Sequence, residues 1–183
     1  MLTIESLATQ GRPNFYDSMA SGLASKVLEL KKELVKESFW DFRNVEHRLE
    51  YVNNIHGIEF INDSKATNIN STWWALESMT KHVIWIAGGQ DRECNYAILQ
   101  ETVKKKVKAI VCLGSENKKL IRAFGNDIKM IVETRSMSEA LKYSNQIAEP
   151  GDVVLLSPGC ASYDMFEDYE DRGRQFKKLI KQF

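Results

Sequence analysis

The chain has 183 residues, of which 43% are hydrophobic, and its 25 basic and 25 acidic side chains give a formal net charge of zero. A chain of this size buries roughly 70% of its unfolded surface, enough for one ordinary domain and a modest additional segment. The balanced charge argues against a nucleic-acid binder that works through a basic field. We therefore expect no nucleic-acid partner.

Two further features bear on location. No apolar run approaches the ~20 residues that span a bilayer, and the N-terminal sequence lacks the order of a signal peptide. The three cysteines are odd in number and lack metal-ligand spacing, which is typical of reduced cytosolic thiols. We expect a cytoplasmic globular protein with no membrane partner and no metal ligands of its own.

Residues 1–44 differ in kind from the rest of the chain. A short extended piece at 3–7 precedes two helical patterns, at 15–25 and 30–38, the second with an amphipathic stripe. One strand and two helices cannot close a core. We therefore expect this segment to be the end of a domain whose beginning lies outside the chain.

Residues 45–183 alternate short apolar runs with helical patterns. Two β-type runs, 50–53 and 58–62, flank an Asn-rich turn and predict a hairpin. Later runs of Val, Ile and Leu predict strands that are buried on both faces, and their alternation with helices predicts right-handed βαβ units. The expected fold is α/β, a doubly wound, mostly parallel sheet with helices on both faces. The other predicted strands are 83–87, 109–113, 128–132 and 153–156, and the predicted helices are 70–79, 96–105, 117–124, 138–147 and 165–181.

Polar or glycine-rich segments directly follow four of the predicted strands, at 63–68, 88–92, 114–117 and 157–162. Open parallel sheets bind ligands at the carboxyl edge of their strands, so the last three segments are expected at one edge. The hairpin leaves the direction of the strand before 63–68 open. Ordinary explanations also exist, since Gly88-Gly89 can be a tight turn and Cys160 a small packing residue.

The segment from Asp63 to Asn68 combines an acid, two hydroxyls and a cation just before a predicted helix. Free N–H groups and the positive end of the helix dipole favour an anion at such a place. Lys65 suits a carboxylate or phosphate, and Asp63 suits a sugar hydroxyl. These residues predict an anionic-ligand site, although the chain contains no phosphate-loop motif and no dinucleotide fingerprint.

Three motifs occur in order along the chain: NVEHRLE at 44–50, INDSKATN at 61–68 and LSPGCAS at 156–162, followed by Phe166 and Arg172-Gly173. Together they resemble the Mur ligases of peptidoglycan synthesis, and most closely the members that add D-glutamate to UDP-N-acetylmuramoyl-L-alanine. The resemblance implies that residues 1–44 are the remnant of a central ATPase domain. It also implies that residues 45–183 are the C-terminal, Rossmann-like domain that binds the amino acid.

The resemblance implies ATP and Mg²⁺ as cofactors of the complete enzyme, which activates a carboxylate as an acyl phosphate for attack by the D-glutamate amine. The main phosphate and metal ligands would lie outside this chain, so we expect the 183 residues alone to be inactive. The complete enzyme is expected to be monomeric. Residues 1–44, having lost their sheet, are expected to expose apolar surface and to favour self-association.

Carried over by position, the resemblance assigns catalytic roles to Lys65 and His47. The implied nucleotide-binding residues are Asn14, Asp17, Arg48 and Asp63, and the implied D-glutamate-binding residues are Lys65, Thr67, Arg92, Ser162, Tyr163 and Tyr169. Four positions depart from the family pattern. Pro13 replaces a histidine, and Asp17 replaces an asparagine and cannot donate. Arg92 replaces a lysine with a planar fork, and Tyr163 replaces an aliphatic residue.

Two alternatives remain open from the sequence. One is a stand-alone doubly wound module that binds an anionic metabolite without turnover. The other is a sibling Mur ligase that adds a different amino acid. All three hypotheses need Lys65, Thr67 and Ser162 to lie along one edge of the sheet.

Overall fold

The computed structural model describes residues 12–31, 45–90 and 94–183, with side chains in the first range from Met19 onward. The chain divides into two compact units, Met1–Val45 and Glu46–Phe183. In the first unit, α1 (Arg12–Val27) contains the predicted helix 15–25, whereas the predicted strand 3–7 and nearly all of the helix 30–38 lie outside the described residues. Exposed apolar side chains of α1 include Met19, Leu23 and Val27.

The second unit is built on one six-stranded sheet with the order β1-β2-β6-β3-β4-β5. All neighbouring strands are parallel except β1 and β2, which form the predicted antiparallel hairpin. This topology confirms the predicted α/β fold. The strands are β1 (Glu50–Ile55), β2 (Ile58–Asn62), β3 (Val83–Gly88), β4 (Val107–Leu113), β5 (Ile131–Thr134) and β6 (Val153–Gly159).

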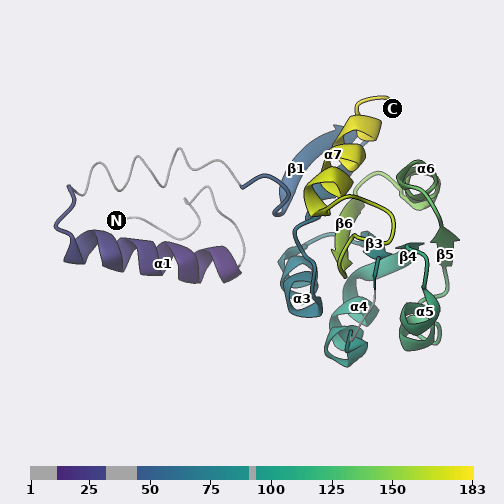
Figure 1. Cartoon of the computed structure of the whole chain (residues 1–183), viewed down its shortest axis with the longest axis horizontal. Coiled ribbons are helices and arrows are strands. Elements are labelled where there is room, and N and C mark those ends of the chain that lie inside the picture. Colours follow the sequence, from purple (N-terminus) through teal and green to yellow (C-terminus); the bar gives the residue numbers. More distant parts are fainter. Residues whose placement is uncertain (1–11, 32–44, 91–93) are drawn as a thin grey trace. The chain divides into compact units, whose positions relative to one another are not determined.

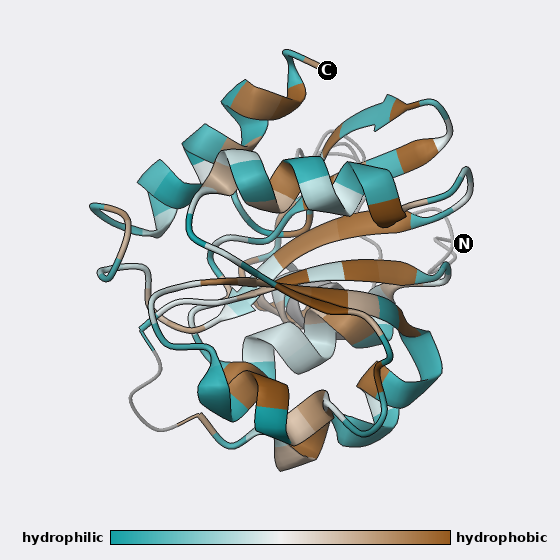
Figure 2. Cartoon of the chain, turned by 90° about the vertical axis from the view of Figure 1, so that its right-hand side faces the viewer, coloured by the Kyte–Doolittle hydropathy of each residue, from teal (hydrophilic) through white to brown (hydrophobic). Residues whose placement is uncertain are grey.

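Helices cover both faces of this sheet (Figure 1). Side chains such as Leu76, Trp85 and Phe124 form the core under the first group of helices, and Ile84, Leu141 and Phe176 form the core under the second. In Figure 2 the central strands are largely brown and lie between helices that carry both teal and brown residues, as expected for strands that are buried on both faces. The first group is α3 (Ile69–Ser78), η2 (Tyr96–Leu99), α4 (Gln100–Lys106) and α5 (Lys118–Phe124), and the second is α6 (Met137–Ile147) and α7 (Tyr169–Ile180).

Several element boundaries differ from the prediction, and two of these differences have a clear cause. The predicted strand 128–132 begins only at Ile131, because the N–H of Ile128 donates to the carbonyl of Phe124 and closes the turn after α5. The predicted helix 165–181 begins only at Tyr169. The Asp168 side chain caps the N-terminus of α7 by accepting from the N–H of Asp171 at 2.6 Å, which is typical of the residue where a helix begins.

The direction of β2 decides where the segment 63–68 emerges. Because β2 pairs in parallel with β6, this segment leaves the sheet at the same edge as the loops that follow β3, β4 and β6. Asn68 then caps α3 by accepting from the N–H of Ser71 at 2.9 Å. Among the described residues, no helix combines the length and the apolar character that a membrane span requires.

Candidate functional site

The loops after β2, β3 and β6 meet around a hollow of about 440 Å³ at the carboxyl edge of the sheet. Its lining includes Thr67, Gln90, Cys94 and Ala161. Backbone hydrogen bonds join the loops, since the N–H of Gly159 donates to Ala66 at 2.9 Å and the N–H of Gln90 donates to Ala161 at 2.8 Å. Three segments that are far apart in sequence therefore form one site.

Gly89 makes the close approach of two of these loops possible. Its φ is +129°, a backbone angle that residues with a side chain rarely adopt. A Cβ at this position would also overlap the carbonyl oxygen of Ala161. The glycine pair after β3 is thus more than a tight turn, because it brings the β3 loop against the β6 loop.

Lys65 and Thr67 are both exposed, and Thr67, two residues after Lys65, lines the hollow. The N–H of Lys65 donates to the carbonyl of His47 at 3.0 Å, which fixes the backbone that carries the ammonium group. Its Nζ lies 5.8 Å from the ring centroid of Tyr169, within the range of a cation–π contact. A cation and a hydroxyl donor therefore stand together next to a half-buried aromatic ring.

The buried side chain of Arg172 in α7 forms hydrogen bonds with two of the loops. The side chain is 1% exposed, and burial lowers the pKa of its guanidinium to about 10. Its Nε donates to Ser64 Oγ at 2.9 Å, Nη2 donates to the Ser64 carbonyl at 2.9 Å, and Nη1 donates to the Cys160 carbonyl at 3.2 Å. One buried fork thus joins the residue before Lys65 to the loop that carries Ser162.

His47 is buried directly behind Lys65. Its side chain is 4% exposed, its Nδ1 lies 2.9 Å from Nδ2 of Asn62, and burial lowers its pKa. The imidazole packs against α7 at Gly173, where a Cβ would overlap the ring. This placement lets His47 position Lys65 through the backbone.

Asp63 is also buried, with 5% exposure. Burial raises its pKa to about 7, although hydrogen bonds from Ser157 Oγ at 2.8 Å and from the N–H of Leu49 at 3.2 Å favour the ionised form. The two non-glycine residues that flank Arg48 have left-handed backbones, with φ of 64° at His47 and 43° at Leu49. Such strain persists only where the surroundings enforce it, and Asp63 supplies one of the bonds that hold the turn carrying the exposed Arg48.

Glu46, His47 and Glu50 form a group with ligand atoms within 4.8 Å of one another, the kind of group that can hold a metal ion. A cation already lies among them, because Lys177 Nζ donates to both glutamates, at 2.9 Å to Glu50. Glu50 also accepts from the N–H of His47 at 3.0 Å. The group therefore fits a structural ion-pair cluster that fastens α7 to the segment before β1.

The remaining predicted residues are placed as follows. Ser162 is 2% exposed and follows Ala161 of the lining, and Tyr163 is 70% exposed. Arg92 lies outside the described residues. Asn14 and Asp17 lie in α1, and their side chains lie outside the described part of the chain.

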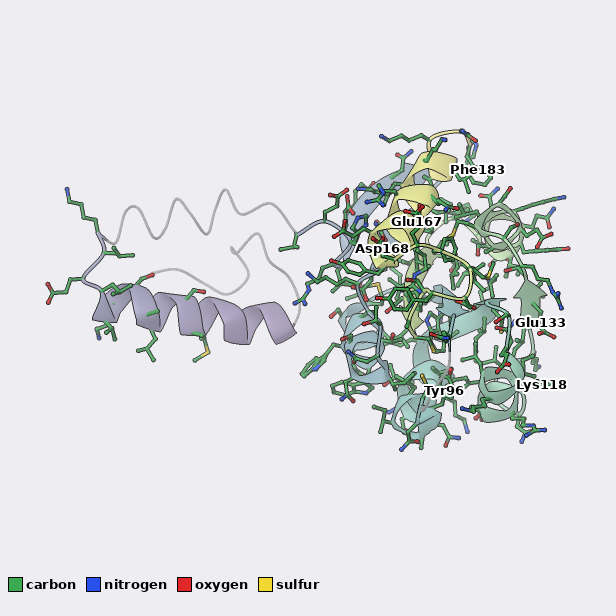
Figure 3. The ribbon with its side chains drawn as sticks, in the orientation of Figure 1. Tyr96, Lys118, Glu133, Glu167, Asp168 and Phe183 are labelled. Atoms are coloured by element: carbon green, nitrogen blue, oxygen red, sulfur yellow. The ribbon has the colours of Figure 1, made fainter. Side chains whose placement is uncertain are left out.

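The loop after β4, also expected to contribute, lines a different hollow of about 370 Å³. Its lining includes Ser115, Lys118, Glu133 and Arg135. Figure 3 labels Lys118 and Glu133 beside α5 and β5, and Asp168 at the beginning of α7. The described loops at this edge therefore line these two separate hollows, and Thr67 belongs to the first.

The sheet order and the loops that converge at the carboxyl edge define a doubly wound α/β domain. Residues 47–160 match the family described as Mur ligase, glutamate ligase domain, and the chain belongs to this family.

Curated relatives match nearly the whole chain. It is 50% identical over 175 residues to the UDP-N-acetylmuramoylalanine–D-glutamate ligase of Christiangramia forsetii and 47% identical over 176 residues to the protein of the same name from Porphyromonas gingivalis. Each match covers 96% of this chain and 39% of the relative. The chain therefore spans about two fifths of the length of these relatives.

Solved structures show the same fold. MurF from Acinetobacter baumannii superposes with a TM-score of 0.71 at 15% identity, and the UDP-N-acetylmuramate–alanine ligase MurC from Thermotoga maritima with a TM-score of 0.69 at 14% identity. Both cover 96% of this chain and 39% of their own chains. At these identities the likeness concerns the fold alone.

Analysis of the sequence did not assign functions to Arg172, Gly173 and Gln90. For Gly173 the sequence offered one signal, because a glycine inside an otherwise helical pattern often marks a close packing contact. Arg172 stood in the motif order together with Gly173, but its burial was not expected, since charged side chains are almost never fully buried unless paired.

Proposed function

We propose that this chain is the C-terminal, amino-acid-binding part of the ATP-dependent ligase that adds D-glutamate to UDP-N-acetylmuramoyl-L-alanine in the cytoplasm. The observation that carries the proposal is the exposed pair of Lys65 and Thr67, in which Thr67 lines the hollow and the backbone at Lys65 is held by His47 and, through Ser64, by Arg172. The names of the relatives and their 50% and 47% identity over nearly the whole chain support it independently.

In this proposal Lys65 is the catalytic residue, because an ammonium in a fixed place stabilises negative charge that develops in the transition state. Thr67 and Ser162 bind the carboxylates of D-glutamate. Tyr169 forms the side of the pocket, and Tyr163 and Arg92 are further contacts with the amino acid. His47 acts as a positioning residue for Lys65. A dicarboxylic amino acid suits this mixture of cation and hydroxyl donors.

The donors at the site also fit part of a nucleotide. Arg48 and Lys65 are exposed and lie at the same edge of the sheet. Their two positive charges would suit a phosphate group. Asp63 would meet the ribose, and Asn14 and Asp17 the adenine, as the family pattern implies. The carboxylates nearest to His47 already hold Lys177, so they fit a magnesium ion poorly. We propose that the magnesium ligands and the main phosphate contacts come from outside these 183 residues.

When bound, ATP would supply the phosphoryl group that activates the acceptor carboxylate. The residues described here would then orient the amine of D-glutamate toward it, which is catalysis by positioning. In this proposal residues 1–44 are the end of the ATPase domain, and the junction near Val45 is the place where the second unit swings to close the site.

A hybrid enzyme tests the proposal. Residues 1–183 replace the matched region of the Christiangramia forsetii ligase, and phosphate release is measured with UDP-N-acetylmuramoyl-L-alanine, ATP and one amino acid at a time. We expect release with D-glutamate and none with L-lysine or meso-diaminopimelate, while the 183-residue chain alone releases none. The parental ligase is the positive control.

Other outcomes separate the alternatives. Release with a different amino acid would identify a sibling ligase. D-glutamate binding by the 183-residue chain, combined with an inactive but folded hybrid, would favour a binding module without turnover.

A further inference from the structure

Two cysteines from distant parts of the chain meet at the wall of the hollow. Cys94 precedes η2 and Cys160 follows β6, and their sulfur atoms lie 3.2 Å apart. Both residues line the hollow. A disulfide has a sulfur–sulfur distance of about 2.05 Å, so the two atoms need to approach by only about 1.2 Å to bond.

We propose that Cys94 and Cys160 form a reversible disulfide, a modification site in the wall of the ligand hollow, when the chain meets a hydroperoxide. The reaction goes beyond the ligase activity and needs no other protein group. Disulfides that form in a reducing compartment are usually transient and redox-sensing, which is the behaviour expected here.

The exposure of the two residues assigns the order of the steps. Cys94 is half-buried, whereas Cys160 is 1% exposed, so a small peroxide reaches Cys94 first. The Cys94 thiolate attacks one oxygen of hydrogen peroxide, an S–O bond forms, the O–O bond breaks, and the second oxygen leaves as water after it is protonated. Cys94 is then a sulfenic acid.

Cys160 resolves this intermediate. Its sulfur attacks the Cys94 sulfur, the S–S bond forms, the S–O bond breaks, and the oxygen leaves as a second water with the remaining thiol proton. Two thiols are oxidised by two electrons in total, and one peroxide is reduced to two waters. The Arg172 guanidinium donates to the Cys160 carbonyl at 3.2 Å and so holds the backbone that carries the attacking sulfur.

The bond would join two loops of the site covalently. Cys160 lies two residues before Ser162 and directly after Gly159, whose N–H donates to Ala66 of the Lys65 loop. Cys94 contacts the same residue, with its sulfur 3.6 Å from the Gly159 carbonyl oxygen. Drawing the two sulfurs together therefore displaces the wall that, if the proposed function holds, faces D-glutamate.

The third cysteine is an internal control. Cys112 of β4 is fully buried in the core, and burial raises the pKa of its thiol to about 12. A thiol in this state is a poor nucleophile, so peroxide should leave it unchanged.

The test treats the 183-residue chain with hydrogen peroxide, digests it without reductant and maps the peptides by mass spectrometry. We expect one cross-linked pair that contains Cys94 and Cys160, two hydrogens lighter than the separate peptides and separated again by dithiothreitol. Cys112→Ala should keep the cross-link and Cys94→Ser should lose it. A Cys94 that is oxidised to sulfinic acid with no cross-link, or one that pairs with Cys112, would overturn the proposal.

A second measurement separates this inference from the proposed function. Isothermal titration compares D-glutamate binding to the reduced and the cross-linked chain, and we expect weaker binding after cross-linking. A cross-link that forms and leaves D-glutamate binding unchanged would support the disulfide and contradict the proposed position of the amino acid.

Discussion

Gly173 in α7 and His47 in the segment before β1 are in direct contact, and a Cβ at position 173 would overlap the imidazole ring. Through this contact α7 reaches the backbone of Lys65, because the His47 carbonyl accepts from the Lys65 N–H at 3.0 Å. The place of Lys65, for which we propose the catalytic role, thus depends on a glycine more than one hundred positions away in the sequence.

Gly173→Ala tests this dependence. The added methyl group must displace the buried His47 ring, and overpacking of this kind costs about 1–3 kcal/mol of the free energy of unfolding. Chemical denaturation of the 183-residue chain measures it. Gly22→Ala is the matched control, since it adds the same methyl to a helix where nothing lies within 4 Å. An equal effect of both substitutions would contradict the contact.

Arg172→Met should destabilise the fold more than Arg174→Met. Arg172 makes three hydrogen bonds to Ser64 and Cys160, and its loss leaves those acceptors buried without the guanidinium donor, at about 1–3 kcal/mol for each group that stays unsatisfied. Arg174 is 53% exposed and pairs with Asp168 at the cap and Glu170 on its own helix, so its loss should cost at most about 0.5 kcal/mol. Urea titrations of both variants compare them, and equal midpoints would count against the role of Arg172.

The pH dependence of stability tests the burial of Asp63. Its folded pKa of about 7 lies above the ordinary value of 3.8, so the folded state binds a proton more tightly and Asp63 lowers stability as pH rises between those values. His47 acts in the opposite direction: burial lowers its folded pKa below 6.5, so its contribution to stability increases as pH rises toward 6.5.

Asp63→Asn removes the first contribution and keeps the second. We expect the free energy of unfolding of the variant, relative to the parent chain, to rise between pH 5 and pH 8, by on the order of 2–4 kcal/mol. Denaturation curves at several pH values measure the difference. Glu101→Gln, at a side chain that is 84% exposed, is the control and should give a curve parallel to that of the parent. A parallel curve for Asp63→Asn would contradict the raised pKa.

Lys65→Ala in the hybrid ligase should lower kcat by roughly a hundredfold or more, because it removes a positioned charge from the developing negative charge. Lys105→Ala is the matched control, a lysine that is 71% exposed and pairs with Glu101 on α4. Steady-state phosphate release measures both. A Lys65→Ala enzyme that keeps the parental rate would refute the catalytic assignment.

Periodicity predicted the sheet because buried parallel strands read as continuous apolar runs, such as 83–87 and 153–156. The same rule predicted a strand at 128–132, whereas β5 begins at Ile131. Ile128 is apolar and 6% exposed, but it packs into the core from a turn, and a pattern of hydropathy does not distinguish the two cases.

The site was predictable where exposed polar residues follow strands, as for Lys65 and Thr67. The burial of Asp63, His47 and Arg172 was not, since polar side chains are usually exposed and only the packing of α7 on the loops makes them interior. The contact between Cys94 and Cys160 likewise depends on how two distant loops meet, which residue spacing does not encode.

The central claim is that the loops after β2, β3 and β6 bind one dicarboxylic amino acid. Titration of the ¹⁵N-labelled 183-residue chain with D-glutamate, followed by NMR, tests it most directly. The amide signals of Lys65, Thr67, Gln90 and Ala161 should shift together with a single dissociation constant, while those of Lys118 and Arg135 at the second hollow should stay in place. Saturable shifts confined to the second hollow, or none at the three loops, would contradict the claim.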